Sequence, residues 1–146
     1  RTSGLCRMII VDTNVLSALA RPEPEAAVLQ WLDSQPELSI WTTSITLMEI
    51  RYGLQIMPAG RRREQMTNEM EVVLKEEIGA RYLFFDVAAA EQAAELMALR
   101  RGRGRPVELR DTMIAGIVLA SQAMLATRNT SHFEDLSVPV VNPWTA

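Results

Sequence analysis

The stretch MIIVDTNVL, residues 8–16, is the starting point for interpreting the whole chain. Its first four residues are apolar and three of them are β-branched, a composition typical of a strand buried on both faces of a parallel sheet. Asp12 then follows the predicted strand at its carboxyl end, where open α/β sheets bind their ligands. Two interpretations of Asp12 stay open: a residue of a functional site, or the N-cap of a helix that begins near Thr13.

Outward from this strand, the chain alternates strand-like and helix-like segments. Further strands are predicted at residues 38–41, 82–85, 124–127 and 138–141, and helices at 13–20, 25–34, 45–57, 64–78, 88–101 and 109–123. This alternation is typical of an α/β layer fold. The hydroxyls of residues 42–44 are expected to cap the helix that follows them.

Composition limits the class of protein. A length of 146 residues with 48% hydrophobic and 23% charged content is ordinary for one globular domain. The single cysteine, Cys6, allows neither an internal disulfide nor a cysteine-based zinc cluster, and it agrees with a cytoplasmic protein. No apolar run is long enough for a membrane span, so we expect no membrane association. We interpret residues 1–7 as an upstream extension or a remnant of cloning.

The charges are unevenly distributed. A net charge of −3 argues against a protein that coats nucleic acid through general basicity, and Lys75 is the only lysine. The arginines, however, form two clusters, one at residues 61–63 and one at residues 100, 101, 103, 105 and 110. Guanidinium groups contact phosphate oxygens in a planar, bidentate manner, so both clusters are either phosphate-binding patches or solvated helix ends.

Three acidic residues occupy comparable places in the predicted elements. Asp12 follows a strand, while Glu49 and Asp111 lie in the first turns of helices that follow a strand or a loop. In a parallel sheet these positions converge on one edge. Crowded carboxylates repel one another unless a positive charge lies among them, and oxygen ligands favour Mg²⁺ or Mn²⁺. Such an ion can activate water for attack on a phosphodiester.

Four segments of the chain resemble the PIN-domain family. They are MIIVDTNVL at residues 8–16, TLMEIRYG at 46–53, RDTMIAG at 110–116 and LATRNTSHFEDLSVPVVNPW at 125–144. The last segment resembles the close of the VapC and FitB branch of that family. The resemblance covers residues 8–144 in the same order. It implies one PIN-like domain over residues 8–146, a three-layer α/β/α sandwich with a mostly parallel central sheet.

The resemblance also implies an activity and a metal site. Members of this branch are metal-dependent endoribonucleases that act as the toxin of a type II toxin–antitoxin pair. Carried over by motif, Asp12, Glu49 and Asp111 are the acids that bind Mg²⁺ or Mn²⁺. The fourth acid of the family commonly falls where this chain has Asn129, which offers an oxygen without a charge. A second metal is therefore expected to bind weakly, or only when RNA phosphate completes its coordination.

Several further residues receive supporting roles from the same resemblance. Thr13 and Asn14 are expected to orient Asp12 or a bound water, and Thr127 to do the same from the strand at 124–127. Glu108 lies one helical turn before Asp111. It either adds the charge missing at Asn129 or simply favours the positive end of the helix dipole.

His132 and three arginines complete the predicted site. His132 is the only histidine and has a side chain suited to proton transfer, although a metal-activated water does not require it. Arg105, Arg110 and Arg128 are expected to hold the phosphate backbone of the RNA.

Partners follow from the family as well. The resemblance implies a cognate antitoxin of the VapB or FitA type, a homodimer that can assemble further with it, and DNA contact only through the antitoxin. An alternative function is a PIN-like module that binds RNA or antitoxin and has lost useful catalysis because of Asn129. An enzyme needs Mg²⁺ or Mn²⁺ for turnover, whereas such a module needs neither ion.

Overall fold

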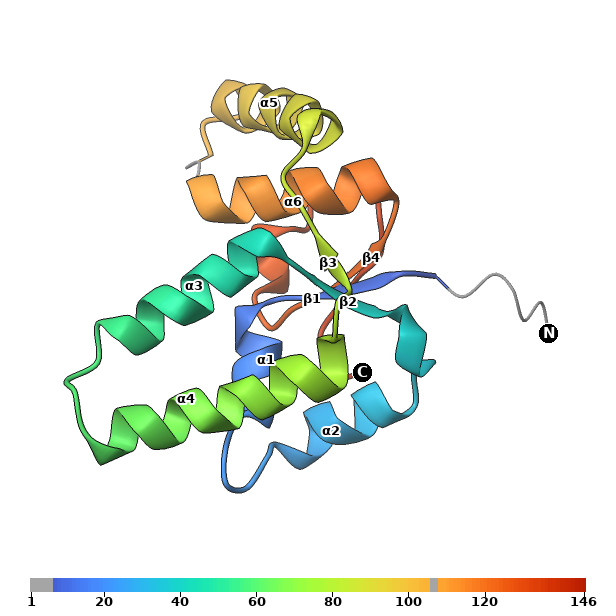
Figure 1. Cartoon of the computed structure of the whole chain (residues 1–146). Helices are drawn as coiled ribbons and strands as arrows, with labels where there is room; N and C mark the ends of the chain where they lie inside the picture. The colour runs from blue at the N-terminus through green and yellow to red at the C-terminus, as the bar shows by residue number, and fades with distance from the viewer. Residues whose placement is uncertain (1–6, 106–107) are drawn as a thin grey trace.

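A computed structural model describes residues 7–105 and 108–146 and contains, within them, one sheet of five parallel strands (Figure 1). The strands run side by side in the order β3-β2-β1-β4-β5. Their bounds are Ile9–Val11 for β1, Ile40–Thr43 for β2, Tyr82–Leu83 for β3, Met124–Ala126 for β4 and Val140–Val141 for β5. Apart from the exposed Arg7, the predicted extension at residues 1–7 lies outside the described residues.

Helices cover both faces of the sheet. One layer contains α1 (Thr13–Leu19), α2 (Ala26–Asp33) and α4 (Arg61–Val73), and the other contains α5 (Val87–Gly102) and α6 (Leu109–Ser121) (Figure 1). Helix α3 (Ser44–Gln55) contacts both layers, because Ile45 packs with the α5/α6 side and Ile50 with the α1/α4 side. The predicted three-layer α/β/α sandwich with a mostly parallel sheet is confirmed.

The position of β1 in the middle of the sheet explains why its sequence is apolar throughout. Ile9 and Val11 pack into the core beneath α1 and α2, while Ile10 packs into the core beneath α5 and α6. All three side chains are buried. A strand with a helical layer on each face has no solvent side, so its sequence is continuously apolar rather than alternating.

The strand order places the end of β1 at a special point of the sheet. The chain builds β2 and β3 on one side of β1, and later returns to place β4 and β5 on the other side. In such sheets the crevice outside the carboxyl ends, where the order reverses, is the usual ligand site. Val11 pairs with Ala126 in the parallel register, so Asp12 and Thr127 emerge next to each other from β1 and β4.

Several predicted bounds were wrong by a few residues. The edge strands β3 and β5 are only two residues long, where four were predicted for each, and the short edges offer little surface for pairing with another chain. Strand β2 starts at Ile40, because residues Glu37–Ser39 form a 3₁₀ turn. The helix predicted at 64–78 begins at Arg61 and closes with a π-helical turn, Leu74–Ile78. The predicted cap of α3 is confirmed at Thr43, whose hydroxyl accepts from the Thr46 N–H at 3.0 Å.

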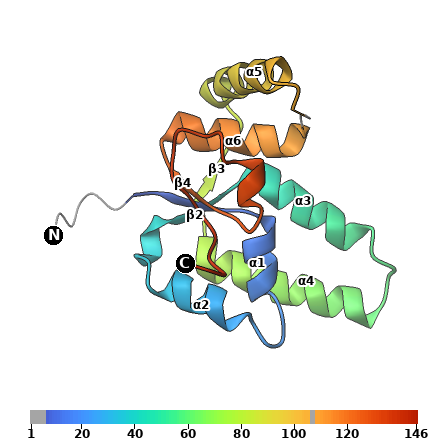
Figure 2. The ribbon, with the colours of Figure 1, turned by 180° about the vertical axis from the view of Figure 1, so that it is seen from behind.

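The segment after β4 returns across the molecule. It forms the short 3₁₀ helix Thr130–His132 (η3) and the strand β5, and the chain ends beside α2 (Figure 2). The Trp144 indole N–H donates to Glu25 Oε2 at 3.3 Å, which fastens this end to the start of α2. None of the helices in the described residues is long and apolar enough to cross a membrane.

Candidate active site

Asp12 lies at the carboxyl edge of the sheet where β1 and β4 end, the place at which such sheets carry a ligand crevice. Its side chain is buried, with 7% of the residue exposed. The Thr127 hydroxyl donates to Asp12 Oδ2 at 2.5 Å, and the helix α1 starts directly after Asp12. Asp12 Oδ1 is also buried and has no hydrogen-bond partner among the described residues. Asp12 also stands at the N-cap position of α1 without a side-chain hydrogen bond of capping geometry, although the nearby Val15 backbone N–H lowers the pKa of its carboxyl.

Burial favours the neutral form of the Asp12 carboxyl. Removal from water raises the pKa of this carboxyl from 3.8 to about 6, because the interior solvates the anion poorly. The hydrogen bond from Thr127 and the nearby Val15 backbone N–H lower the pKa, while the negative charges of Asp111 and Glu49 raise it further. The three acids therefore act on one another electrostatically, and a cation bound between them would favour the ionised form of Asp12.

Glu49 approaches this crevice from α3. The Thr13 hydroxyl donates to Glu49 Oε1 at 3.1 Å, so the residue after Asp12 holds the second acid. Partial burial raises the pKa of Glu49, and the hydrogen bond from Thr13 and the charge of Arg110 oppose this shift. Thr13 thus touches Glu49 rather than the predicted Asp12.

Asp111 lies in the first turn of α6 and faces η3. Its Oδ2 atom is 2.9 Å from His132 Nδ1, which makes His132 a direct neighbour of a predicted metal-binding acid. The side chain of Asp111 is largely shielded, whereas that of His132 is about half exposed. The sequence identified His132 by its chemistry alone, and the tertiary structure supplies its contact.

The polar turn after β4 lies beside Asp12. The Asn129 backbone N–H donates to Thr127 Oγ1 at 3.1 Å, so Thr127 receives one hydrogen bond while it gives another to Asp12. Asn14 accepts from the Arg128 N–H at 3.1 Å and thereby joins α1 to this turn. Asn14 therefore holds the turn rather than Asp12. The Asn129 side chain itself makes none of the hydrogen bonds found in the described residues, and the residue is exposed.

Arg110 and Glu108 stand at the mouth of the crevice. Arg110 Nη1 lies 3.6 Å from Glu49 Oε2, and Arg110 Nε lies 3.7 Å from Glu108 Oε1. Glu108 is the N-cap of α6 and accepts from the Arg110 backbone N–H at 3.1 Å. This contact agrees with the interpretation of Glu108 as a helix-start acid.

The other two predicted RNA-contacting arginines also have partners within the protein. Arg105 Nη1 is 3.2 Å from Asp135 Oδ2, and the Arg128 guanidinium lies 4.8 Å from the centre of the Trp144 ring. Arg128 is exposed and Arg105 is half-buried. Arg105 lines a cavity with Asp111, and Arg128 directly follows Thr127.

Sequence reasoning missed Arg100 and Asp135. Arg100 was assigned to a cluster of phosphate-binding or solvated arginines, but only 3% of it is exposed and it forms an ion pair with Asp135 at 2.9 Å. No local pattern points to this pair, because the two residues are 35 positions apart.

The residues of the crevice fit a hard divalent cation in their chemistry. The available ligands are carboxylate oxygens, which Mg²⁺ and Mn²⁺ prefer, and Asp12 Oδ1 is a buried oxygen in need of a partner. Within residues 7–105 and 108–146, no three acidic, histidine or cysteine side chains stand close enough to surround one ion. Glu49 and Asp111 face Arg110 and His132 instead. A cation bound by Glu49 and Asp111 would thus replace their contacts with Arg110 and His132.

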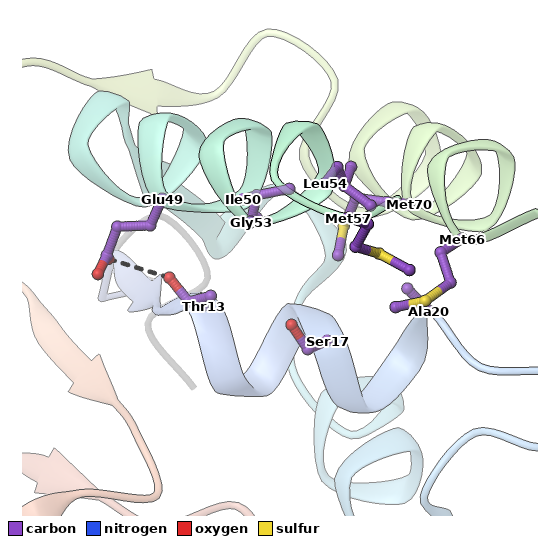
Figure 3. A pocket seen from close by; sticks show the side chains of 10 residues that line it. All are labelled: Thr13, Ser17, Ala20, Glu49, Ile50, Gly53, Leu54, Met57, Met66 and Met70. Atoms are coloured by element: carbon purple, nitrogen blue, oxygen red, sulfur yellow. Dashed lines mark hydrogen bonds between the residues drawn. The ribbon is translucent and has the colours of Figure 1, made fainter. Parts of the chain in front are cut away.

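An apolar groove extends from Glu49 along the molecule. This cavity of about 250 Å³ lies between α1, α3 and α4 (Figure 3). Thr13 and Glu49 stand at one end, joined by their hydrogen bond, and Met57, Met66 and Met70 stand at the other. Methionine side chains adapt to irregular apolar surfaces, so the groove suits a flexible apolar segment.

Together, the fold and the crevice define a parallel α/β protein with an acidic site at the switch point of its sheet. The chain belongs to the PIN-domain family, since the family model described as PIN domain matches residues 9–138. The predicted family is therefore confirmed.

Relatives agree with the predicted VapC and FitB branch. The chain is 40% identical over 137 residues to the VapC ribonuclease Y4jK of Sinorhizobium fredii, covering 94% of this chain and 98% of that protein. It is 31% identical over 137 residues to toxin FitB of Neisseria gonorrhoeae, covering 94% and 99%. The crystal structure of FitAcB from Neisseria gonorrhoeae matches with a TM-score of 0.84 at 30% identity, over 95% of this chain and 100% of that one.

Proposed function

We propose that this chain is a Mg²⁺- or Mn²⁺-dependent endoribonuclease that hydrolyses RNA phosphodiesters, and that it is the toxin of a type II toxin–antitoxin system. The main support is the buried, unpartnered Asp12 Oδ1 at the switch point of the sheet, within electrostatic reach of Glu49 and Asp111. The similarity to a VapC ribonuclease and to toxin FitB gives independent support.

In this proposal Asp12, Glu49 and Asp111 hold the metal. The bound ion supplies Lewis acidity, which polarises the scissile phosphate and lowers the pKa of water. Thr127 keeps the Asp12 carboxylate in one orientation, and Thr13 does so for Glu49. Water would lose a proton and attack phosphorus in line, the bond to the leaving oxygen would break, and that oxygen would take up a proton from solvent water.

Arginines and Asn129 position the RNA. Arg105 lines a cavity with Asp111, Arg110 lies 3.6 Å from Glu49 and Arg128 follows Thr127. These arginines would contact backbone phosphates, which fixes the position of the RNA strand without selecting its bases. Asn129 lies two residues after Thr127 on the exposed turn and would supply a neutral amide to the site. A site with three carboxylates and one amide favours one tightly held metal over two.

We propose that the apolar groove receives a segment of a VapB- or FitA-like antitoxin. The groove leads directly to Glu49, so an apolar segment with a basic residue at its end would fill the groove and neutralise the crevice at once. The chain is further proposed to be cytoplasmic and homodimeric, to assemble with the antitoxin, and to reach DNA only through it. The solved FitAB complex bound to a DNA fragment supports this arrangement.

Cleavage of a panel of labelled RNAs by the purified chain tests the proposal. Reactions contain Mg²⁺, Mn²⁺ or EDTA, and compare the natural chain with Asp12→Asn. Asp33→Asn is the matched control, because it makes the same chemical change on an exposed helix end. We expect cutting with either metal, none with EDTA, and loss of cutting only in Asp12→Asn.

Equal cutting by Asp12→Asn and the natural chain would contradict the assignment of the site. A folded, antitoxin-free chain that cuts no RNA with either metal would instead favour the module that binds RNA or antitoxin without catalysis. Binding of uncleaved RNA in EDTA then identifies that second function.

A further inference from the structure

Arg100, near the end of α5, is an arginine with almost no exposed surface. Arginines are seldom fully buried, because removing the guanidinium from water is unfavourable unless its donors are satisfied. Here Nε and Nη2 donate to the two carboxylate oxygens of Asp135, each at 2.9 Å. This fork-to-fork geometry is the strongest arrangement of an arginine with a carboxylate.

The remaining donors of Arg100 connect two segments of the proposed active site. Nη2 also donates to the His132 carbonyl at 2.9 Å, and Nη1 donates to Thr112 Oγ1 at 3.3 Å. Thr112 directly follows Asp111 in α6. Arg100 therefore holds the η3 segment with one part of its guanidinium and the start of α6 with another.

His132 and Asp111 form a further contact between η3 and the start of α6. His132 Nδ1 lies 2.9 Å from Asp111 Oδ2, across the interface that Arg100 bridges. The His132 backbone N–H donates to the Asn129 carbonyl at 3.0 Å, which ties the position of Asn129 to the same segment. Arg105 Nη2 also donates to the Ser131 carbonyl at 3.4 Å, and the buried Phe133 follows η3 in the core, but Arg100 is the buried side chain that joins η3 to the start of α6.

The electrostatics of Asp135 agree with a permanent pair. The hydrogen bonds from Arg100 lower the pKa of Asp135, and the positive charge of Arg105 contributes in the same direction. The side chains of Arg100 and Asp135 are both nearly inaccessible, at 4% and 6% exposure. A buried pair of this kind has one favourable geometry, so it specifies position more than it adds stability.

We infer that Arg100 is a positioning residue of the active site: through Asp135 and the His132 carbonyl it holds the η3 segment so that His132 faces Asp111. The catalytic part of this inference rests on the proposed ribonuclease function. Arg100 itself touches neither RNA nor metal in this scheme. Its effect reaches the reaction only through the placement of other residues.

The single histidine of the chain offers a direct spectroscopic test. His132 ring signals are recorded by NMR on the metal-free chain, prepared without a histidine tag, so every histidine signal belongs to this residue. The variant Asp111→Asn shows where the His132 signals lie when His132 has lost its charged partner. Arg100→Lys keeps the positive charge but cannot form the bidentate pair. We expect Arg100→Lys to displace the His132 signals in the direction set by Asp111→Asn.

Kinetics supply the second readout. We expect Arg100→Lys to lower kcat by about tenfold to a hundredfold, because small misplacements at an active site are costly, while KM changes less than about twofold. Arg51→Lys is the matched control, since it makes the same change in an arginine whose ion-pair partner is the exposed Glu71 of α4. Asp135→Asn breaks the same pair with little change of volume and replaces Arg100→Lys if that variant does not fold.

The outcomes separate the two proposals. Unchanged His132 signals, with kcat per folded molecule equal to that of the natural chain, would overturn the positioning role. If the natural chain cuts no RNA with Mg²⁺ or Mn²⁺, the proposed function fails, but the His132 signals still decide whether Arg100 positions the η3 segment.

Discussion

Thr127 Oγ1 donates a hydrogen bond of 2.5 Å to Asp12 Oδ2 and so joins the ends of β4 and β1, 115 positions apart in the chain. The parallel pairing of Val11 with Ala126 makes this contact possible, because each polar residue follows its strand by one position. The hydroxyl lowers the pKa of a carboxyl that burial raises, and it leaves the other carboxylate oxygen without a partner. The pair thus sets both the charge and the orientation of the proposed central metal ligand.

Thr127→Val tests this contact. The substitution keeps the shape of the side chain but removes the donor, so the pKa of Asp12 should rise above about 6. Metal binding requires the carboxylate, and we therefore expect weaker Mn²⁺ binding near neutral pH and an acidic limb of the pH–rate profile that moves to higher pH. Thr127→Ser, which keeps the hydroxyl, should resemble the natural chain. An identical profile for Val and Ser would show that the hydrogen bond does not control Asp12.

The raised pKa of Asp12 also predicts how stability depends on pH. Between its unfolded value of 3.8 and its native value of about 6, the native state binds more protons than the unfolded state. The free energy of unfolding of the metal-free chain should therefore fall as the pH rises through this window. The shift corresponds to about 3 kcal/mol at most. Asp12→Asn should lack this decline and be more stable than the natural chain above pH 6, measured by urea unfolding in EDTA.

Added metal should reverse that order. A ligand that binds only the native state at 100 times its Kd stabilises a protein by about 2.7 kcal/mol. We expect Mg²⁺ or Mn²⁺ to raise the melting temperature of the natural chain and to leave that of Asp12→Asn unchanged. Equal shifts in both proteins would place the ion elsewhere.

Asn129→Asp should change the metal stoichiometry. A fourth carboxylate beside the crevice adds negative charge to a site that already holds three acids, so we expect tighter Mn²⁺ binding and a second bound ion by calorimetry. Without metal the same variant should be less stable, because the added charge repels its neighbours. Asn129→Ala serves as the control for loss of the amide. A single ion in Asn129→Asp would mean that this position lies outside the reach of the metal.

Arg128→Ala should weaken RNA binding in a sequence-independent manner. Arg128 is exposed beside the Trp144 ring, and loss of one phosphate contact to a single strand reduces the slope of log K against log salt by about 0.7. The measurement uses the Asp12→Asn background to prevent cleavage, and Arg51→Ala as the control. A loss that differs strongly between RNA sequences would instead indicate base recognition.

Gly116→Ala tests the packing of the α5/α6 layer. A Cβ at Gly116 would lie 2.4 Å from the Ala89 carbonyl oxygen, so the two helices would have to separate. We expect a loss of about 1–3 kcal/mol in the free energy of unfolding, by urea titration. Gly53→Ala, in the exposed last turn of α3 with open space around it, should gain about 0.5–1 kcal/mol. Equal effects of the two substitutions would contradict the close approach.

Strongly local patterns were sufficient for much of the fold. The apolar run before Asp12 predicted a strand with helices on both faces, and Thr43 was predicted among the capping hydroxyls of α3, because strands and caps depend on neighbours in sequence. The edge strands were predicted too long. Their ends depend on whether a partner strand is present, and at Phe84 the side chain is exposed and the pairing has stopped.

The sequence by itself determined the alternation of strands and helices and the strand that carries Asp12, since hydrophobic period is a property of the chain. The resemblance to the PIN-domain family added the three-layer arrangement, and Glu49 and Asp111 stay predicted metal-binding acids. Only the tertiary structure showed that Arg100, which the sequence places in an arginine cluster, is buried and paired with Asp135. The contact of His132 with Asp111 likewise appears only in the tertiary structure. Each of these pairs joins residues more than 20 positions apart. Long-range partners of charged side chains are chosen by packing, because burial makes one geometry favourable among many that the local sequence allows.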